Sequence, residues 1–299
     1  MTSPPKIAVF GVPSAAGGGH PALADAPRRL RDAGLLEALR ASPLTVVNLS
    51  DLSLFPFRDD PEHPHARNAE VVSCAVRATS DEMTRALAEG FTLVLGGDCT
   101  LVAGVVAGAW ASLGEPVGLI YLDANGDLNT PETSPSGYLS GMALSLALGR
   151  APGAVSATSS PAVLPEHVAL IGYRDLDPGE RHSIGDLGLA LPAAAAKTLG
   201  MRVTAALALD AVANGDGPLV VHLDVDVIDS VEMPAKQTIT PGIGFTWQET
   251  SDLLTALLAS KRVVALLVCE YQPEKDPGLV LGRRLVEIIT RAVARHARG

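Results

Sequence analysis

The hydrophobic positions of this sequence fall into short, uninterrupted apolar runs separated by longer amphipathic stretches. The runs are rich in Val, Ile and Leu and do not alternate with polar residues, which is typical of strands buried on both faces of a sheet. We therefore predict strands at Lys6–Val12, Leu44–Leu49, Phe91–Leu95, Val117–Leu122, His167–Tyr173, Leu219–Asp226 and Arg262–Glu270.

The stretches between these runs have the apolar spacing of helices. They are Pro21–Ala41, Asn68–Glu89, Leu101–Ala111, Gly141–Leu148, Val203–Ala213, Trp247–Ser260 and Leu281–Ala297. Strands that alternate with helices predict a three-layer α/β/α fold, with a mostly parallel central sheet covered on both sides. A chain of 299 residues, 47% of them hydrophobic, can bury one large core, so we expect a single domain over residues 1–299.

Composition narrows the range of partners. A net charge of -10 disfavours nucleic acid and anionic membranes, whereas it would suit a cationic small molecule. No apolar run approaches the roughly 20 residues needed to cross a bilayer. The three cysteines, Cys74, Cys99 and Cys269, are too few and too scattered for a disulfide framework. With no secretory signal pattern at the N-terminus, these features predict a cytoplasmic protein.

The segment Arg150–Pro165 is rich in Ala, Ser, Pro and Gly. We interpret it as a surface loop, and a mobile lid is the alternative.

Two predicted strands end in clusters of carboxylates. If the chain stays extended, Asp123, Asn125 and Asp127 share one face, and so do Asp224 and Asp226. Buried carboxylates this close repel one another, and one or two divalent cations are the usual remedy. For either cluster alone, helix caps or Asx turns explain the residues equally well. Their joint presence at strand ends favours a metal site.

A third predicted strand ends in the glycine turn Gly96–Cys99. Together, the three segments resemble the motifs G-G-D-H, D-A-H-x-D and D-x-D-x-x-D of the arginase/agmatinase (ureohydrolase) family, in the same order. Here the motifs read Gly96–Cys99, Asp123–Asp127 and Asp224–Asp229. Four further segments resemble the substrate loops and the last strand end of that family. They are Asn129–Thr133, Ser136–Gly141, Arg174–Glu180 and Cys269–Pro273.

The resemblance implies an arginase-like fold and two Mn²⁺ ions per subunit, sharing a hydroxide that attacks a guanidinium or amidine carbon. The implied metal ligands are Cys99, Asp123, Asn125, Asp127, Asp224 and Asp226. The implied substrate-binding residues are Asn129, Ser136, Tyr138, Asp177, Glu180 and Glu270. Asp127, Ser140 and Glu270 match positions that take part in catalysis, and Asp229 is expected to be structural.

The sequence departs from the family pattern at four of these positions. Cys99 and Asn125 replace the two metal-binding histidines, Ser140 replaces a proton-shuttling histidine, and Tyr138 stands where arginases have Asn. A thiolate is soft and poorly matched to Mn²⁺, so Cys99 also admits Zn²⁺ or Fe²⁺. A carboxamide is a weaker ligand than imidazole, and a serine hydroxyl is no general acid near neutral pH.

We therefore expect a metal-dependent C–N hydrolase acting on a guanidino compound such as arginine or Nω-hydroxy-arginine, with release of urea or hydroxyurea. One alternative is an agmatinase-like ureohydrolase whose substrate lacks the α-carboxylate. Another is a metal-impaired pseudoenzyme with a binding role. The family resemblance further implies a homo-oligomer, a trimer or a hexamer.

Overall fold

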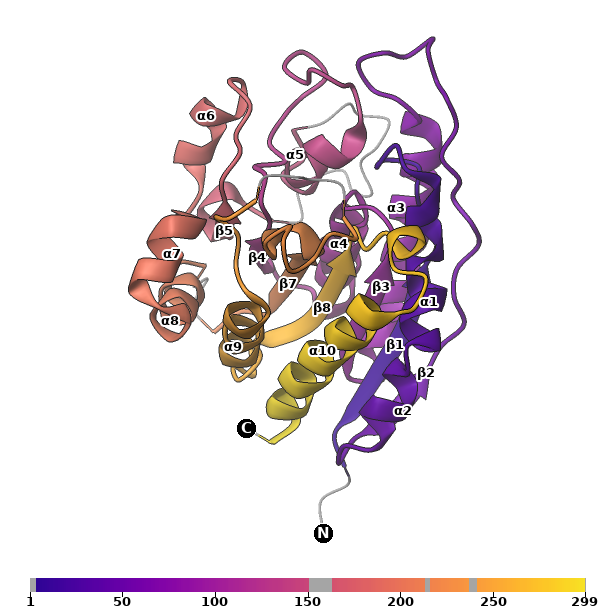
Figure 1. The fold of residues 1–299 in the computed structure, drawn as a ribbon, viewed down its shortest axis with the longest axis vertical. Coiled ribbons are helices and arrows are strands. Elements are labelled where there is room, and N and C mark those ends of the chain that lie inside the picture. The colour runs from indigo at the N-terminus through magenta and orange to yellow at the C-terminus, as the bar shows by residue number, and fades with distance from the viewer. Residues whose placement is uncertain (1–3, 151–162, 213–215, 237–240, 299) are drawn as a thin grey trace.

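A computed structural model describes residues 4–150, 163–212, 216–236 and 241–298. Its strands are β1 Lys6–Val12, β2 Thr45–Asn48, β3 Phe91–Gly96, β4 Gly118–Leu122, β5 Val168–Tyr173, β6 Leu189–Pro192, β7 Leu219–Asp224 and β8 Val263–Cys269. All pairings between them are parallel, in the order β2-β1-β3-β8-β7-β4-β5-β6 (Figure 1). The predicted α/β fold with a parallel central sheet is confirmed.

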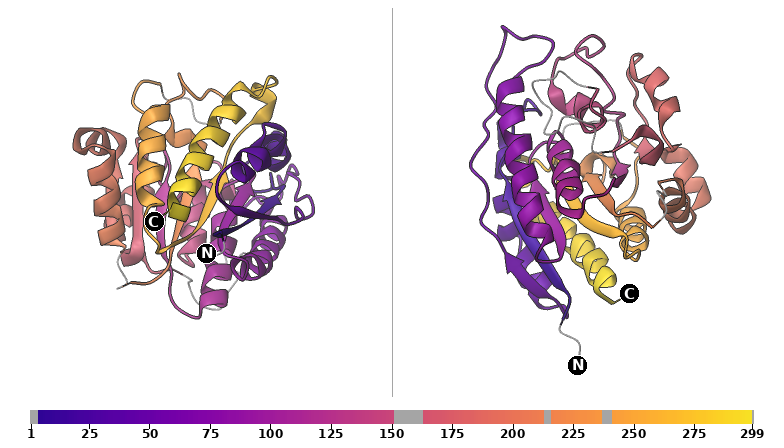
Figure 2. Two further views of the ribbon diagram at one scale, coloured as in Figure 1. Left: turned by 90° about the horizontal axis from the view of Figure 1, so that it is seen from below. Right: turned by 180° about the vertical axis from the view of Figure 1, so that it is seen from behind.

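Helices cover both faces of this sheet, as Figure 2 shows. The α-helices are α1 Ala26–Asp32, α2 Leu35–Arg40, α3 Ala69–Leu87, α4 Leu101–Leu113, α5 Ala143–Ala147, α6 Glu180–Ser183, α7 Ala193–Leu199, α8 Met201–Ala211, α9 Trp247–Leu257 and α10 Val280–Arg298. Short 3₁₀ helices are η1 Pro21–Asp25, η2 Leu139–Met142, η3 Pro165–His167, η4 Ile184–Asp186, η5 Val225–Val227 and η6 Pro273–Lys275.

The core is divided by the sheet into two apolar layers. Side chains of β1, β3, β4, β5, β7 and β8 that point to one face pack against α1, α2, α7, α8, α9 and α10. Those that point to the other face pack against α3, α4 and α5, and this second layer includes Tyr121, Cys99 and Cys269. Because successive strand residues alternate between the layers, burial on both sides explains why the strands read as continuous apolar runs.

One prediction of local structure is wrong, and three described elements, β6, α6 and α7, were not predicted. The stretch Pro21–Ala41 forms η1, α1 and α2 instead of one helix, because Gly34 adopts a left-handed conformation with φ 97° and ends the first segment. The strand β6 was not predicted. It has four residues, all half-buried at the edge of the sheet, so its sequence lacks the long apolar run that marks the central strands.

Most of the predicted loop Arg150–Pro165 lies outside the described residues, which omit 151–162, and so does Ala213 at the end of a predicted helix. None of the described helices is long and apolar enough to cross a bilayer.

Candidate metal and substrate site

The carboxyl ends of β3, β4, β7 and β8 surround a cavity of about 210 Å³. Parallel strands place their carboxyl ends at one edge of the sheet, where ligand sites of such folds form. The residues that line the cavity are Cys99, Asp123, Asn125, Asp127, Ser136, Tyr138, Ser140, Gly141, Asp177, Asp224, Asp226 and Glu270. All six residues predicted as metal ligands therefore meet in one place.

The segment after β4 brings Asp123 and Asp127 to the cavity by turning, and it does not stay extended as the alternation argument assumed. Asp127 has φ 52°, in the left-handed region. Its carbonyl accepts hydrogen bonds from the amides of Leu144 (3.0 Å) and Ser145 (3.1 Å), which tie the turn to α5. Its carboxylate accepts a 2.6 Å bond from the Tyr121 hydroxyl. Such a strained backbone persists only where its surroundings hold it.

The segment after β7 turns directly into η5, so Asp224 and Asp226 are placed by local hydrogen bonds. The Asp224 carboxylate accepts from the amide of Asp226 (2.6 Å), and the Asp226 carboxylate accepts from the amide of Ala124 (3.0 Å). The carbonyl of Asp226 accepts from Lys236 Nζ (2.7 Å) and from Arg174 Nη2 (2.6 Å). Two cations thus hold the backbone of this turn without neutralising its carboxylates directly.

The turn after β3 carries Cys99 at the cavity, and hydrogen bonds to the Asp98 carboxylate hold this turn in position. Asp98 is fully buried and accepts from the hydroxyl of Ser14 (2.6 Å) and from the amide (3.1 Å) and hydroxyl of Thr100. The Cys99 thiol donates to Asp224 Oδ2 at 3.1 Å. Asp98 is therefore structural, and Cys99 is the residue of this turn that lines the cavity.

Glu270 follows β8, and its backbone is also left-handed, with φ 65°. Its amide donates to the carbonyl of Gly97 (2.8 Å), and its Oε1 accepts from the amide of Cys99 (3.2 Å). The second oxygen, Oε2, is buried and has no partner among the described residues. An unpaired carboxylate oxygen on the cavity wall is suited to a cationic ligand.

The electrostatics of the cavity call for bound cations. Burial, reinforced by neighbouring carboxylates, raises the pKa of Asp123, Asp224 and Glu270 well above their usual values. Burial also raises the pKa of Asp127, although the Tyr121 hydroxyl opposes this. A divalent ion would reverse these shifts, because it stabilises the ionised form of each carboxyl group.

The donor atoms fit such an ion. Asp123, Asp224 and Asp226 offer oxygens that lie within 4.8 Å of one another, and so do Cys99, Asp224 and Glu270 with their sulfur and oxygens. Asp123 Oδ2 is buried and has no hydrogen-bond partner among the residues that the structure describes, which is costly unless a cation lies beside it. The residues present can therefore hold metal.

On the substrate side, Ser136, Tyr138, Ser140 and Asp177 line the cavity, whereas Asn129 and Glu180 lie outside its lining. Glu180 is buried and accepts from the amides of Leu128 (2.9 Å) and Asp177 (2.8 Å). Asn129 Nδ2 donates to Asp177 Oδ2 (2.8 Å). In this structure Asn129 and Glu180 hold Asp177 in place.

Two residues of this region were missed from the sequence, Tyr121 and His222. They pair across β4 and β7, and their rings stack with centroids 4.1 Å apart and planes 10° from parallel. Each precedes a site aspartate, Asp123 or Asp224, by two residues. The period of two that grouped the aspartates could have found both residues, because positions i and i+2 of a strand share a face.

His222 is fully buried, and burial lowers its pKa to about 3, so the imidazole is neutral. Its Nε2 lies 3.3 Å from Cys99 Sγ. Its Nδ1 has no hydrogen-bond partner among the described residues. Burial also raises the pKa of the Cys99 thiol.

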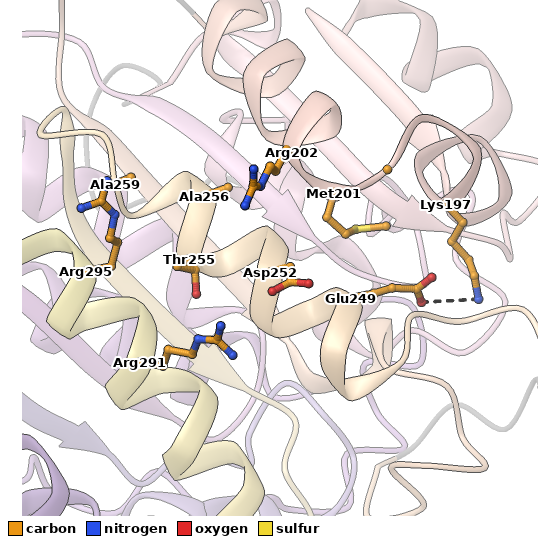
Figure 3. A pocket seen from close by; sticks show the side chains of 11 residues that line it. Lys197, Met201, Arg202, Glu249, Asp252, Thr255, Ala256, Ala259, Arg291 and Arg295 are labelled. Carbon is orange, nitrogen blue, oxygen red and sulfur yellow. Dashed lines mark ion pairs between the residues drawn. The ribbon is translucent and has the colours of Figure 1, made fainter.

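A larger hollow, of about 670 Å³, lies among α7, α8, α9 and α10 (Figure 3). Arg202, Arg291 and Arg295 line it, and Lys197 there pairs with Glu249 at 3.5 Å. None of the site residues predicted from the sequence lines this hollow.

Comparisons with known proteins agree with this geometry. Residues 5–294 match the family model described as the arginase family. An arginase of Staphylococcus aureus (strain MRSA252) is 32% identical over 285 residues, covering 92% of this chain and 93% of that protein. An arginase of Bacillus subtilis (strain 168) is 31% identical over 291 residues, covering 95% and 96%.

Among solved structures, the arginase of Bacillus caldovelox superposes with a TM-score of 0.88 at 28% identity, covering 97% of this chain and 98% of that one. The match extends along nearly the whole sequence and includes every strand that builds the cavity. The chain belongs to the arginase family, hydrolases that act on C–N bonds in linear amidines.

Proposed function

We propose that this protein is a metal-dependent amidinohydrolase whose substrate is an α-amino acid with a guanidino group, arginine or Nω-hydroxy-arginine. Water adds to the guanidinium carbon, the C–N bond to the side chain breaks, and the products are urea or hydroxyurea and a primary amine. The observation that carries the proposal is the cavity, whose lining contains six carboxylates and, among the described residues, no lysine or arginine. Such a wall selects for cations.

The metal ligands would be Asp123, Asp127, Asp224 and Asp226, with Cys99 and Asn125 completing the set. Two Mn²⁺ ions suit the oxygen ligands, and Cys99 extends the choice to Zn²⁺ or Fe²⁺. A divalent ion held there would lower the pKa of water toward neutrality and so supply the nucleophile at working pH.

The protein's own residues orient the substrate. Glu270 Oε2, which has no hydrogen-bond partner in the described part of the chain, would accept hydrogen bonds from the guanidinium and fix its plane in the cavity. Asp177 lines the same cavity, and its position suits an α-amino group. Ser136 and Tyr138 line the cavity beside it and would contact an α-carboxylate.

Ser140 limits the chemistry at the leaving group. It lines the cavity where a proton donor is needed, but a hydroxyl is no general acid near neutral pH. The alkylamine that leaves is the same for arginine and Nω-hydroxy-arginine, but the electron-withdrawing hydroxyl of a hydroxyguanidine makes the carbon under attack more electrophilic and so offsets part of this loss. We therefore expect Nω-hydroxy-arginine to be turned over faster than arginine.

One observation favours a second candidate, a substrate without the α-carboxylate. Both side-chain groups of Asn129 are engaged inside the protein, with Nδ2 on Asp177 and Oδ1 accepting from Thr133 (3.0 Å). Carboxylate recognition then depends on Ser136 and Tyr138. An agmatine-like amine would not need Asn129.

The test is a substrate panel on metal-loaded protein: arginine, Nω-hydroxy-arginine and agmatine, with urea or hydroxyurea and the amine product quantified together. We expect turnover of the two amino acids and a preference for the hydroxylated one. Faster turnover of agmatine would select the second candidate. Full metal occupancy without turnover of any guanidino or amidino compound would leave a binding role and refute the catalytic proposal. By family analogy we also propose a trimer or hexamer, which light scattering would measure.

A further inference from the structure

The loss of the two metal-binding histidines leaves the site, on sequence grounds, with no imidazole. His222 changes this picture, since β7 places its ring under the aspartate cluster on the face that Asp224 shares. Its Nε2 lies 3.3 Å from Cys99 Sγ. One ring nitrogen of His222, Cys99 Sγ and an oxygen of Asp123 all lie within 4.8 Å of one another.

We propose that His222 is a metal ligand, forming with Cys99 and Asp123 a sulfur–nitrogen–oxygen site suited to Zn²⁺. An imidazole from β7 thereby replaces the histidine that the glycine turn after β3 has lost. The proposal rests on the metal-dependent activity proposed above and specifies the ligands of one of its ions. It also implies two unlike sites, because the neighbouring group Asp123, Asp224 and Asp226 offers only oxygens.

The distances support ligation of a common ion. Zinc binds thiolate sulfur at about 2.3 Å and imidazole nitrogen at about 2.0–2.1 Å, so two such ligands at a tetrahedral angle lie about 3.6 Å apart. The observed separation of Sγ and Nε2, 3.3 Å, is close to this value. Cys99 Sγ also lies 3.1 Å from Asp224 Oδ2, so a further carboxylate oxygen lies close to this group.

A purely structural role explains His222 poorly. A buried imidazole normally satisfies both ring nitrogens with hydrogen bonds. Here Nδ1 has no partner among the described residues, and Nε2 faces a thiol, a weak hydrogen-bonding group. The imidazole ring instead stacks on the ring of Tyr121, whose hydroxyl donates a hydrogen bond to the Asp127 carboxylate. This stacking fixes the direction of Nε2, as a ligand requires.

The donor set decides which ion is preferred. Thiolate and imidazole suit Zn²⁺, whereas carboxylates suit Mn²⁺. The structure therefore points to a mixed pair, with Zn²⁺ on the side of Cys99 and His222 and Mn²⁺ on the side of Asp224 and Asp226.

The first experiment uses the wild-type protein loaded with one equivalent of zinc and measures X-ray absorption at the zinc edge. We expect one sulfur at about 2.3 Å together with imidazole scattering. Zinc surrounded by oxygen alone, or by sulfur without imidazole, would overturn the proposal. Because turnover is not measured, this failure is distinct from that of the proposed function, which fails if the wild-type protein binds no divalent metal.

The second experiment compares His222→Phe with wild type by metal analysis and Zn²⁺ titration. Phenylalanine keeps a ring against Tyr121 and removes both nitrogens. We expect Zn²⁺ affinity to fall at least about tenfold, the lower end of what the loss of even an outer partner costs. The matched control is His167→Phe: His167 Nδ1 also has no hydrogen-bond partner among the described residues, but His167 ends η3 before β5 and belongs to none of the described side-chain groups that could share a metal ion. Unchanged Zn²⁺ affinity in folded His222→Phe would overturn the proposal.

A relocation variant addresses the case in which His222→Phe fails to fold. Cys99→His combined with His222→Ala moves the imidazole to the turn after β3 and opens the space that it needs. We expect this protein to bind one Co²⁺ without the thiolate-to-cobalt charge-transfer band that the wild type shows. Absence of that band in wild type loaded with Co²⁺ would count against the site, whatever the variants do.

Discussion

At the scale of single residues, the cavity contains two kinds of carboxylate. Asp123, Asp224 and Asp226 offer oxygens within 4.8 Å of one another and can share a cation. Glu270 also lies within 4.8 Å of donor atoms of Cys99 and Asp224, but it stands on a separate strand end, and its Oε2 has no hydrogen-bond partner among the described residues. We therefore expect substitution of Glu270 to weaken catalysis without loss of metal, and substitution of the three aspartates to weaken metal binding.

Glu270→Gln should leave metal content unchanged and weaken catalysis by about 2–4 kcal/mol, because a desolvated guanidinium loses its charged partner. That corresponds to a loss of roughly 30- to 900-fold in kcat/KM. Metal analysis and steady-state kinetics on the best substrate of the panel make the measurement. Glu82→Gln on α3, which removes a carboxylate paired with Arg85 away from the cavity, is the control and should keep full activity. Equal kcat/KM in Glu270→Gln and wild type would remove the assigned role.

Among the proposed ligands Asn125 should be the weakest, since a neutral carboxamide oxygen binds a divalent ion less tightly than imidazole does. Asn125→His should raise Mn²⁺ affinity and occupancy, measured by titration of the metal-free protein. Asn125→Gln, which keeps the carboxamide, should not. Cys99→His is sterically blocked in the presence of His222, because His222 Nε2 lies 3.3 Å from the Cys99 sulfur. Introducing a histidine at position 99 therefore requires a smaller residue at position 222. No gain in Mn²⁺ affinity for Asn125→His would place residue 125 outside the coordination sphere.

At the scale of elements, the site depends on how closely the turn after β3 packs against its neighbours. A Cβ on Gly97 would lie 1.7 Å from the carbonyl oxygen of Ser14. The carbonyl of Gly97 also accepts the amide of Glu270, so the same turn positions Cys99 and the strand end after β8. Glycine is required here by the close approach of two backbones, because Gly97 is not among the residues with positive φ.

Gly97→Ala should therefore destabilise the fold by about 1–3 kcal/mol or more, the usual cost of inserting an atom into a packed region. It should also weaken metal binding, because Cys99 and Glu270 must shift with the turn. Denaturant unfolding and metal titration test the two effects. The control is Gly185→Ala, where a Cβ would meet no atom within 4 Å. If the two variants are equally stable, the close approach is not what requires glycine at position 97.

At the scale of the whole molecule, the carboxylate cluster couples stability to metal and to pH. The folded-state pKa values of Asp123, Asp127, Asp224 and Glu270 lie above their unfolded values, with burial as the largest cause. In metal-free protein, such groups stabilise the fold at low pH, and this stability is lost as pH rises through the folded-state pKa values. A bound cation offsets the repulsion that then develops.

We expect Mn²⁺ or Zn²⁺ to raise Tm most at pH 7–8 and progressively less toward pH 5, because protons compete with the metal for the same oxygens. Thermal unfolding of metal-free and metal-loaded protein across this range is the measurement. Asp224→Ala should abolish the metal-dependent part of the shift. A Tm that is independent of metal at pH 8 would contradict a metal site in this cavity.

The sequence alone predicted much of the molecule. Seven of the eight described strands were marked by apolar runs, and for six of them the reason is burial on both faces, which removes polar residues from the strand itself, whereas β2 is half-buried to exposed. The aspartates that we propose as metal ligands stood out in the sequence because charge at the end of such a run needs compensation. The edge strand β6 and the break at Gly34 were missed, since a short, half-buried strand and a single left-handed glycine leave only a weak pattern.

Three-dimensional packing decided the rest, because it depends on distances between segments far apart in the chain. Only the parallel register of β4 and β7 places Tyr121 against His222, and only the turn after β3 sets Cys99 beside that ring. Glu180 and Asn129 were predicted to bind substrate, but neither lines the cavity. Glu180 accepts a hydrogen bond from the Asp177 amide, and Asn129 donates one to the Asp177 carboxylate, so both hold Asp177 in place. The sequence determined which chemical groups are available and on which strand ends, since burial and alternation are local properties. The tertiary structure determined which of these groups meet. Hydrogen bonds and metal coordination depend on distances between atoms of segments far apart in the chain, and no local sequence pattern encodes those distances.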